Sequence, residues 1–288
     1  MVCRTWSPVL FVLPALAFYV MFVTYPLLGT INYSLHEWDG ASPLMNFVGL
    51  ENYIELFQNE IFWRALGNNA IWIITTIVVP VFLGLYLAVL LSTDKLKGVT
   101  LFRVSFFVPA VLSLVVVSIV WTWIYHPEYG KVNVYLRAFG LDSLTRAWLG
   151  NPDTVLGALL AAGSWTYYGF CMVIFMAALQ SIDRTYYEVA KIDGANSVQI
   201  FFKITVPMLK NTVTMLILNS MIGSFKVFDI IYVTTRGGPY HSSEVVSTYM
   251  YDKAFYTNEV GYGAAIAITL AIFIAVFSGL YLRSAERD

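Results

Sequence analysis

Charge is scarce in this sequence. Only 12% of its 288 residues are charged, about half the usual share of a soluble domain, while 58% are hydrophobic. The mean hydropathy is +0.69. That balance indicates an integral membrane protein. The formal net charge of −1, with no basic run, excludes a nucleic-acid-binding surface.

Chemically reactive side chains are also few. The two cysteines, Cys3 and Cys171, are too few and too far apart for a disulfide framework or a zinc site. The three histidines, His36, His126 and His241, are scattered over predicted loops. Phosphate-binding, zinc-protease and serine-nucleophile motifs are missing. We therefore expect no catalytic residue, no metal site and no cofactor bound by this chain, so any energy for transport must come from another chain.

Long apolar runs, by contrast, are abundant. A transmembrane helix needs about 20 mostly apolar residues. The first run continues beyond the cleavage-like Ala15-Leu16-Ala17, so we expect a retained anchor instead of a signal peptide. The sequence predicts an all-α polytopic membrane protein with six transmembrane helices. They cover about residues 8–33, 70–92, 104–125, 154–179, 208–232 and 262–282.

The predicted spans divide the chain into three parts. Residues 1–69 are expected to form an N-terminal transmembrane helix with an external connecting segment. Residues 70–282 form a core of five transmembrane helices with a cytoplasmic loop at 183–207, and residues 283–288 form a short tail. Short helices are expected in the connections 36–69, 126–153 and 235–261.

Basic residues predict the orientation. Ten of the 17 lysines and arginines fall in the segments that face the cytoplasm if the N-terminus is inside, and six fall in the longer connections on the other side. Because cytoplasmic loops carry the excess of Lys and Arg, both termini and the 183–207 loop are expected in the cytoplasm.

The loop itself predicts two short helices joined by a turn. Asp183 or Thr185 can cap the first helix, and Gly194 can end it in a left-handed conformation. Ser197 is expected to cap the second helix, and Pro207 to break it before the next span. A polar hairpin of this kind either docks into a partner or anchors the bundle at the membrane surface, and the residue pattern alone favours neither.

Residues 188–207 read EVAKIDGANSVQIFFKITVP. This spacing resembles the signature E-A-A-x-x-x-G, nine residues, I-x-L-P of bacterial ABC importer permeases. Only Val189 and Val206 depart from it, where the family has Ala and Leu. The stretches Phe47 to Tyr53, His126 to Gly130 with Asn133, and Phe228-Asp229 with Gly237-Gly238-Pro239 resemble the carbohydrate-uptake branch of these permeases.

The resemblance implies a type I importer permease fold in a prokaryotic plasma (inner) membrane. It implies four partners besides the lipid bilayer and a carbohydrate substrate: a second homologous permease, two cytoplasmic ATPase subunits that use ATP and Mg, and an external solute-binding protein. By the same resemblance a coupling helix contacts the ATPase through Glu188, Val189, Ala190, Asp193, Gly194 and Ala195.

Two groups inside the predicted spans are candidates for a substrate pathway. Trp165, Tyr167 and Tyr168 lie near the middle of the fourth span, where aromatic faces and hydroxyls suit a sugar. Helix packing around Gly163 and Gly169 explains the same residues equally well.

The fifth span carries Asn219, Lys226 and Asp229. Asn219 and Lys226 are two turns apart and are expected to share a face, with Asp229 one turn further. We expect Asn219 to line the pathway, whereas an ion pair or snorkelling accounts for Lys226 and Asp229 without substrate.

The sequence therefore predicts the transmembrane subunit of an ATP-driven, binding-protein-dependent importer that carries a sugar or related polyol by alternating access. A secondary transporter driven by an ion gradient is the alternative, but it requires buried carboxylates near mid-depth. An intramembrane enzyme would need a nucleophile and base, and no histidine lies in any predicted span.

Overall fold

The computed structural model describes residues 7–92 and 98–287. Within those residues the chain is helical apart from one short β-hairpin, which confirms the all-α prediction. Arg4, Lys95 and Lys97, which contribute to the predicted orientation, lie outside the described residues.

The spans are partly continuous and partly broken. Within the described residues, four helices are long and apolar enough to cross a membrane: Phe11–Ser34, Glu60–Leu91, Pro152–Gln180 and Val260–Ala285. Two further spans are bent pairs, Val99–Val111 with Leu114–Ile124 at 99° and Ser197–Met208 with Lys210–Phe225 at 68°. Counting each pair as one span gives the six predicted. Within the segments predicted over 104–125 and 208–232 the helix is interrupted, after Val111 and after Phe225.

The breaks have local backbone causes. Leu112 and Ser113 adopt extended dihedrals, with ψ of 143° and 133°, so the helix stops one turn after Pro109 and restarts in a new direction. Leu209 and Lys226 each leave the helical region with ψ near 5°. The residues on both sides of each break are mostly apolar. A hydropathy pattern therefore predicts the length of the apolar segment, but it does not reveal where the helix axis changes direction.

The chain forms two compact units, Met1–Phe62 with Tyr249–Phe273, and Trp63–Thr248 with Ile274–Asp288. In the first unit, the strands β1 and β2 form an antiparallel hairpin in which His36 pairs with Phe47. Asn52 Nδ2 donates to the carbonyls of Ser34 and His36 at 2.9 and 3.0 Å and so holds the start of this hairpin in place. Its elements are α1 (Ser7–Tyr19), η1 (Val20–Thr24), α2 (Tyr25–Ser34), β1 (His36–Glu37), β2 (Asn46–Phe47), α3 (Glu51–Gln58), the end of α15 (Val246–Tyr251), η5 (Asp252–Tyr256) and the first half of α16 (Val260–Arg287).

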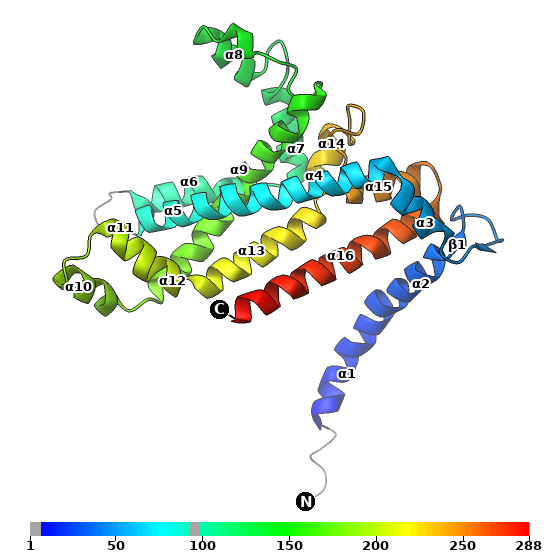
Figure 1. Ribbon diagram of the computed structural model, residues 1–288, viewed down its shortest axis with the longest axis horizontal. Coiled ribbons are helices and arrows are strands. Elements are labelled where there is room, and N and C mark those ends of the chain that lie inside the picture. Colours follow the sequence, from blue (N-terminus) through cyan, green and yellow to red (C-terminus); the bar gives the residue numbers. More distant parts are fainter. Residues whose placement is uncertain (1–6, 93–97, 288) are drawn as a thin grey trace, which may run out of the picture. The chain divides into compact units, whose positions relative to one another are not determined.

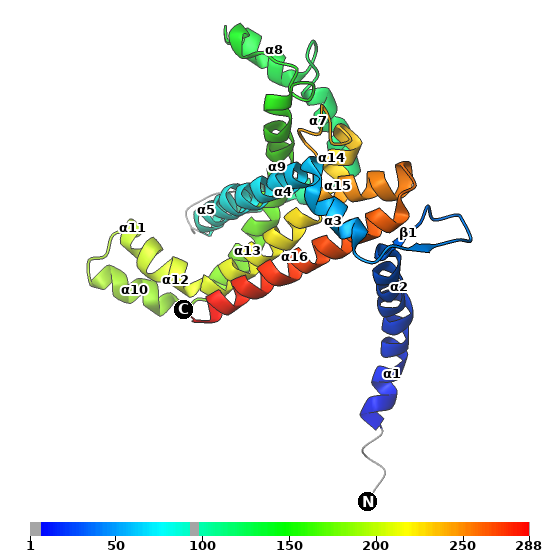
Figure 2. The same cartoon turned by 45° about the vertical axis from the view of Figure 1, so that its right-hand side comes forward.

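The second unit is built around one long helix, α9 (Pro152–Gln180), which runs between α8 and the α10–α12 hairpin in both ribbon views (Figures 1 and 2). The helices α5, α6 and α13 pack along it. The other elements are α4 (Glu60–Thr76), η2 (Ile77–Val81), α5 (Phe82–Leu91), α6 (Val99–Val111), α7 (Leu114–Ile124), α8 (Lys131–Ala138), η3 (Asp142–Leu144), α10 (Arg184–Ile192), α11 (Ser197–Ile200), η4 (Phe201–Thr205), α12 (Val206–Met208), α13 (Lys210–Phe225) and α14 (Asp229–Thr234).

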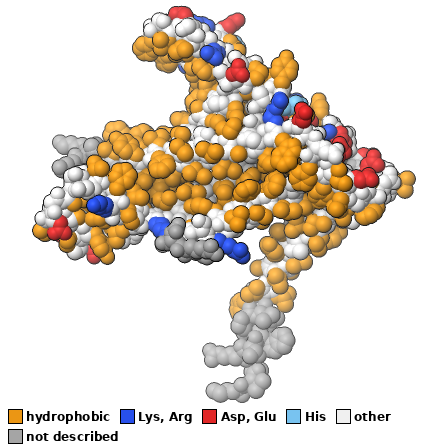
Figure 3. All heavy atoms as spheres, viewed as in Figure 1, with side chains coloured by type: hydrophobic (Ala, Val, Ile, Leu, Met, Phe, Trp, Pro, Cys, Tyr) orange, Lys and Arg blue, Asp and Glu red, His pale blue; other side chains and the backbone are white. Residues whose placement is uncertain are grey.

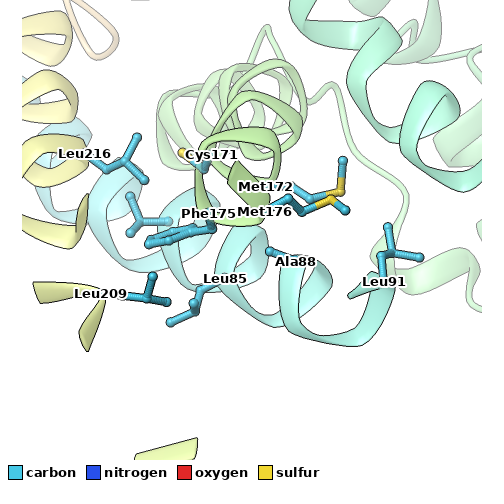
Figure 4. Close-up of a cluster of buried hydrophobic side chains, with 10 residues drawn as sticks. Leu85, Ala88, Leu91, Cys171, Met172, Phe175, Met176, Leu209 and Leu216 are labelled. Atoms are coloured by element: carbon cyan, nitrogen blue, oxygen red, sulfur yellow. The ribbon is translucent and has the colours of Figure 1, made fainter. Parts of the chain in front are cut away.

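Side chains from α5, α9 and the start of α13 form the core of this unit (Figure 4). Their backbones approach closely at Gly84, where a Cβ would lie 2.6 Å from Cys171 Cβ and 2.8 Å from Met172 N. Close contact of this kind is how helices associate in a membrane, where lipid is as apolar as the side chains. The buried residues are Val81, Leu85, Ala88, Leu91, Cys171, Met172, Phe175, Met176, Leu209 and Leu216.

The two glycines of the fourth span have the same packing role. A Cβ on Gly163 would lie 2.7 Å from the Trp72 ring of α4, and one on Gly169 would collide with the Phe106 carbonyl of α6. Helix packing therefore explains both glycines, whatever the aromatic residues between them do.

The outer face of α4, η2 and α5 is apolar. Ile74, Val78, Phe82, Tyr86 and Leu90, spaced four residues apart, are all exposed. In Figure 3, hydrophobic side chains cover this stretch. An exposed apolar stripe of this length is a lipid-facing surface.

Candidate functional site

The helix α10 begins and ends with local signals in the sequence. The Asp183 carboxylate accepts from the Thr185 N–H at 2.9 Å and from its hydroxyl at 2.8 Å. These bonds favour the charged carboxylate and lower the pKa of Asp183. At the other end, Gly194 has a φ of 76°, and the N–H groups of Gly194 and Ala195 donate to the carbonyls of Lys191 and Ala190. This is a Schellman ending, so the predicted role of Gly194 as the helix stop is confirmed.

The start of the second helix differs from the prediction. Asn196, not Ser197, is the cap: its side chain accepts from the Gln199 N–H, and the Gln199 side chain accepts from the Asn196 N–H, both at 2.9 Å. Because Asn and Ser are comparable caps, the neighbouring Gln decides the position by completing a capping box.

Pro207 does not break this second helix. The chain continues through the π-turn η4 into α12, and the bend follows at Leu209. A proline is tolerated there because it lies in the first turn after η4, where no helical N–H bond is needed from it.

The α10 hairpin presents uncovered apolar groups. Ala190 is buried, but Val189 is exposed and Ile192 is 84% exposed. Glu188 and Asp193 are exposed beside them. In both ribbon views the hairpin lies beyond the ends of α9 and α13 (Figures 1 and 2). An apolar surface bordered by carboxylates is typical of an interaction site.

Two pathway candidates meet in the structure. Asn219 Nδ2 donates to the Tyr167 hydroxyl at 3.2 Å, and the Ser220 hydroxyl donates to the same oxygen at 3.3 Å. Tyr167 is half-buried and Asn219 is exposed. The Ser220 hydroxyl has one proton and also donates to the Leu216 carbonyl, at 2.8 Å, so the Tyr167 hydroxyl belongs to a small polar cluster; the Asn219 carbonyl oxygen is the group available to a ligand.

The other two aromatic candidates contact different helices. Trp165 lies edge-on to Trp121 of α7, with ring centroids 5.8 Å apart. Tyr168 lies edge-on to Phe106 of α6, at 6.2 Å. The structure therefore does not gather Trp165, Tyr167 and Tyr168 into one cluster.

The predicted fifth span is interrupted after Lys226. The helix α13 ends at Phe225 with Lys226 as its C-cap, and the Lys226 N–H still donates to the carbonyls of Ile222 and Gly223, so the shared face of Asn219 and Lys226 stays a prediction. Asp229 starts the separate helix α14, so the prediction that it lies one turn further on the same helix is wrong. The side chains of Lys226 and Asp229 are both exposed. Among the described residues the two ion pairs are His241–Glu244 and Lys253–Glu259, so the ion pair considered for Lys226 and Asp229 does not form.

A buried polar connection at this break escaped the sequence prediction. Asn69 of α4 is 0% exposed; its Nδ2 donates to the Ser224 carbonyl at 2.8 Å and its Oδ1 accepts from the Val246 N–H at 2.9 Å. The Ser247 hydroxyl donates to the Val227 carbonyl. These side chains satisfy backbone groups that a continuous helix would pair internally, which permits the chain to leave the helix at Lys226.

Asn68, the preceding residue, fixes the adjoining loop. Its Nδ2 donates to the carbonyls of Ser242 and Glu244 at 3.1 and 2.7 Å. The buried Glu244 carboxylate accepts from the Thr248 hydroxyl at 2.5 Å and pairs with His241 Nδ1 at 2.9 Å. The only sequence signal for this arrangement is an Asn-Asn pair directly before an apolar run, within a segment assigned to the external connection.

The fold and these sites define a class. A bundle of membrane-crossing helices, with uncharged polar groups at mid-depth and a hairpin exposed at one end, is the transmembrane component of a transport system. In residues 7–92 and 98–287 no cluster of three His, Cys, Asp or Glu side chains is placed to hold a metal ion.

The comparisons assign the family. Residues 72–287, well over half of the chain, match the family described as the inner membrane component of binding-protein-dependent transport systems. The chain belongs to this family. It is the translocation subunit of a binding-protein-dependent importer and not an enzyme, and it is a multi-pass membrane protein.

Similar proteins and a solved structure support the same family assignment. The probable ABC transporter permease protein YurN of Bacillus subtilis (strain 168) is 40% identical over 278 residues, which cover 96% of this chain and 94% of YurN. The lactose transport system permease protein LacF of Rhizobium radiobacter is 34% identical over 280 residues, covering 96% and 93%. A permease chain in the crystal structure of a bacterial ABC transporter for the acidic polysaccharide alginate has a TM-score of 0.87 at 24% identity, covering 99% and 96%. The predicted ABC importer permease fold is confirmed.

Proposed function

We propose that this chain carries a sugar or related polyol across a prokaryotic inner membrane. It acts with a second homologous permease and with two ATPase subunits, which bind ATP and Mg. The observation that carries the proposal is the α10 hairpin, with its Schellman ending and its uncovered Val189 and Ile192. The name of LacF supports a sugar as the cargo.

The coupling step follows from the hairpin. Glu188, Val189, Ala190, Asp193, Gly194 and Ala195 form the contact with the ATPase. The side chain of Ile192 extends that surface, since nothing in its own unit covers it. Closure of the ATPase pair moves the hairpin, and α9 and α13 carry the movement into the spans because the hairpin connects them directly.

The pathway is lined by neutral polar groups. Tyr167 and Asn219 place a hydroxyl and an amide within hydrogen-bond reach of one another, and the second amide hydrogen and the carbonyl oxygen of Asn219 can bind a cargo hydroxyl. An exposed asparagine in a membrane span is costly in lipid, so Asn219 faces a wet path or a partner helix. Tyr167 and Asn219 are both uncharged, so an uncharged hydroxylated cargo suits this pair. Trp165 and Tyr168 remain further candidates.

The orientation is part of the proposal. With α10 against the ATPase, the C-terminal end of α9 is cytoplasmic, and both chain termini are cytoplasmic as well. Residues 126–151, at the opposite end of α9, are then external.

Substitution of Gly194 tests the coupling. Leucine at a φ of 76° is strained by about 1–2 kcal/mol and reshapes the contact. We expect Gly194→Leu either to prevent assembly with the ATPase or to give ATP hydrolysis without uptake in proteoliposomes. The control is Gly98→Leu, because Gly98 has the same φ of 76° and, like Gly194, nothing within 4 Å of a Cβ. Equal uptake by the two variants would contradict the proposal.

A further inference from the structure

The connection between α7 and α9 folds into a small lobe, residues 126–151, that carries α8 and η3. We propose that this lobe is a docking surface for the external solute-binding protein, through the face of α8 formed by Lys131, Tyr135 and Phe139. The inference rests on the orientation proposed above and adds a contact surface to it.

The position of the lobe suits a soluble partner. The helix α9 has 29 residues and is therefore about 43 Å long at 1.5 Å per residue. The hydrocarbon layer is about 30 Å thick, or about 40–45 Å with headgroups. The lobe lies beyond the N-terminal end of α9 in both views (Figures 1 and 2), so a membrane-spanning α9 places it outside the apolar layer.

Internal hydrogen bonds hold the backbone of the lobe in place. The buried Asn133 side chain donates to the carbonyls of Pro127 and Arg146 at 2.9 Å each and accepts from Trp148 Nε1 at 2.8 Å. Arg137 donates to the carbonyls of Glu128 and Pro127 at 3.0 and 3.1 Å. A surface held in this way loses little conformational entropy on binding.

The outward face of α8 has the composition of an interface. Tyr135 is 60% exposed and Phe139 is 78% exposed. With Lys131 they are spaced four residues apart and so lie along one side of the helix. Exposed aromatic residues next to a cation are typical binding anchors. The fitting partner surface is a shallow apolar depression bordered by a carboxylate.

The other loop of the same unit, residues 235–248, is arranged differently. Tyr240 is 83% exposed there, but the side chains of Ser243, Glu244, Val245 and Thr248 are buried and held by internal bonds. That loop therefore exposes one aromatic side chain, whereas the lobe has two, one turn apart on α8.

The test uses the complete importer in proteoliposomes, with its cognate solute-binding protein titrated from outside. ATP hydrolysis is measured against binding-protein concentration. We expect Tyr135→Ala with Phe139→Ala to raise the half-maximal concentration at least tenfold, with the maximal rate and assembly unchanged. Lys131→Glu should raise it as well, and more steeply at low salt. The control is Tyr129→Ala, a tyrosine of the same lobe that is 61% exposed but precedes α8 and stacks on His126.

Two results would overturn the inference. One is a half-maximal concentration within twofold of wild type in the double variant. The other is loss of assembly with the second permease, because it would assign the face to the contact between the permeases. A wild-type importer that shows no stimulation by any binding protein would instead refute the proposed function, and this surface with it.

Discussion

The buried amide of Asn69 allows a quantitative prediction. Asn69→Leu keeps the branching of the side chain at Cγ but removes the donor to the Ser224 carbonyl and the acceptor for the Val246 N–H. Both backbone groups are then left without a partner in an apolar setting. Each such loss costs about 1–3 kcal/mol, so the variant should be destabilised by about 2–6 kcal/mol.

Thermal unfolding of the detergent-solubilised protein measures this loss. By the scaling of soluble domains of similar size, 1 kcal/mol shifts Tm by about 2–4 °C, so a decrease of at least about 4 °C is expected. The control is Asn211→Leu, because Asn211 is exposed; exposed substitutions stay within about 0.5 kcal/mol. If Asn69→Leu unfolds within 2 °C of wild type, the connection does not hold α13 to the following loop as argued.

Two further substitutions examine the packing and the pathway. Gly84→Leu forces a side chain into the Met172 backbone, whose N atom would lie 2.8 Å from the new Cβ, and should abolish the monodisperse peak in size-exclusion chromatography; Gly67→Leu, with nothing within 4 Å, should leave that peak intact. Tyr167→Phe removes the hydroxyl that accepts from Asn219 and Ser220. Loss of a hydrogen bond to the cargo at this hydroxyl should change the half-saturating substrate concentration for uptake about fivefold. The control Tyr86→Phe, at an exposed tyrosine, should leave this concentration unchanged. If it is unchanged in both variants, Tyr167 is a packing residue.

The sequence was most informative where one residue determines the local backbone. Gly194 was identified as a helix stop because few other residues adopt a φ of 76° at low cost. The long span predicted over 154–179 matches α9, Pro152–Gln180, because a buried helix with a proline at its start leaves a clear pattern.

The sequence was least informative where two distant segments meet. The break at Leu112 and the end of α13 at Phe225 lie in apolar surroundings, so composition continues unchanged across them. The partners of Asn69 are 155 and 177 residues away. Tyr167 and Asn219 were predicted as separate candidates on two different spans. Their contact became evident only from the tertiary structure.

The continuity of α9 bears on how the proposed mechanism works. The other spans of the second unit are interrupted, by the π-turn η2, by the 99° bend between α6 and α7, or by the breaks on either side of α13. Only α9 joins the α10 hairpin to the lobe 126–151, which is external in the proposed orientation, without a break in the described backbone. Gly84 of α5 and Gly169 of α9 bring α5 and α6 to backbone distance from α9, and Gly163 makes room for the Trp72 ring of α4, so a displacement of α9 should move these helices too. A continuous central helix surrounded by interrupted helices permits a movement of the α10 hairpin to reach the lobe. The interrupted helices can change their shape at the same time. Alternating access requires both of this subunit.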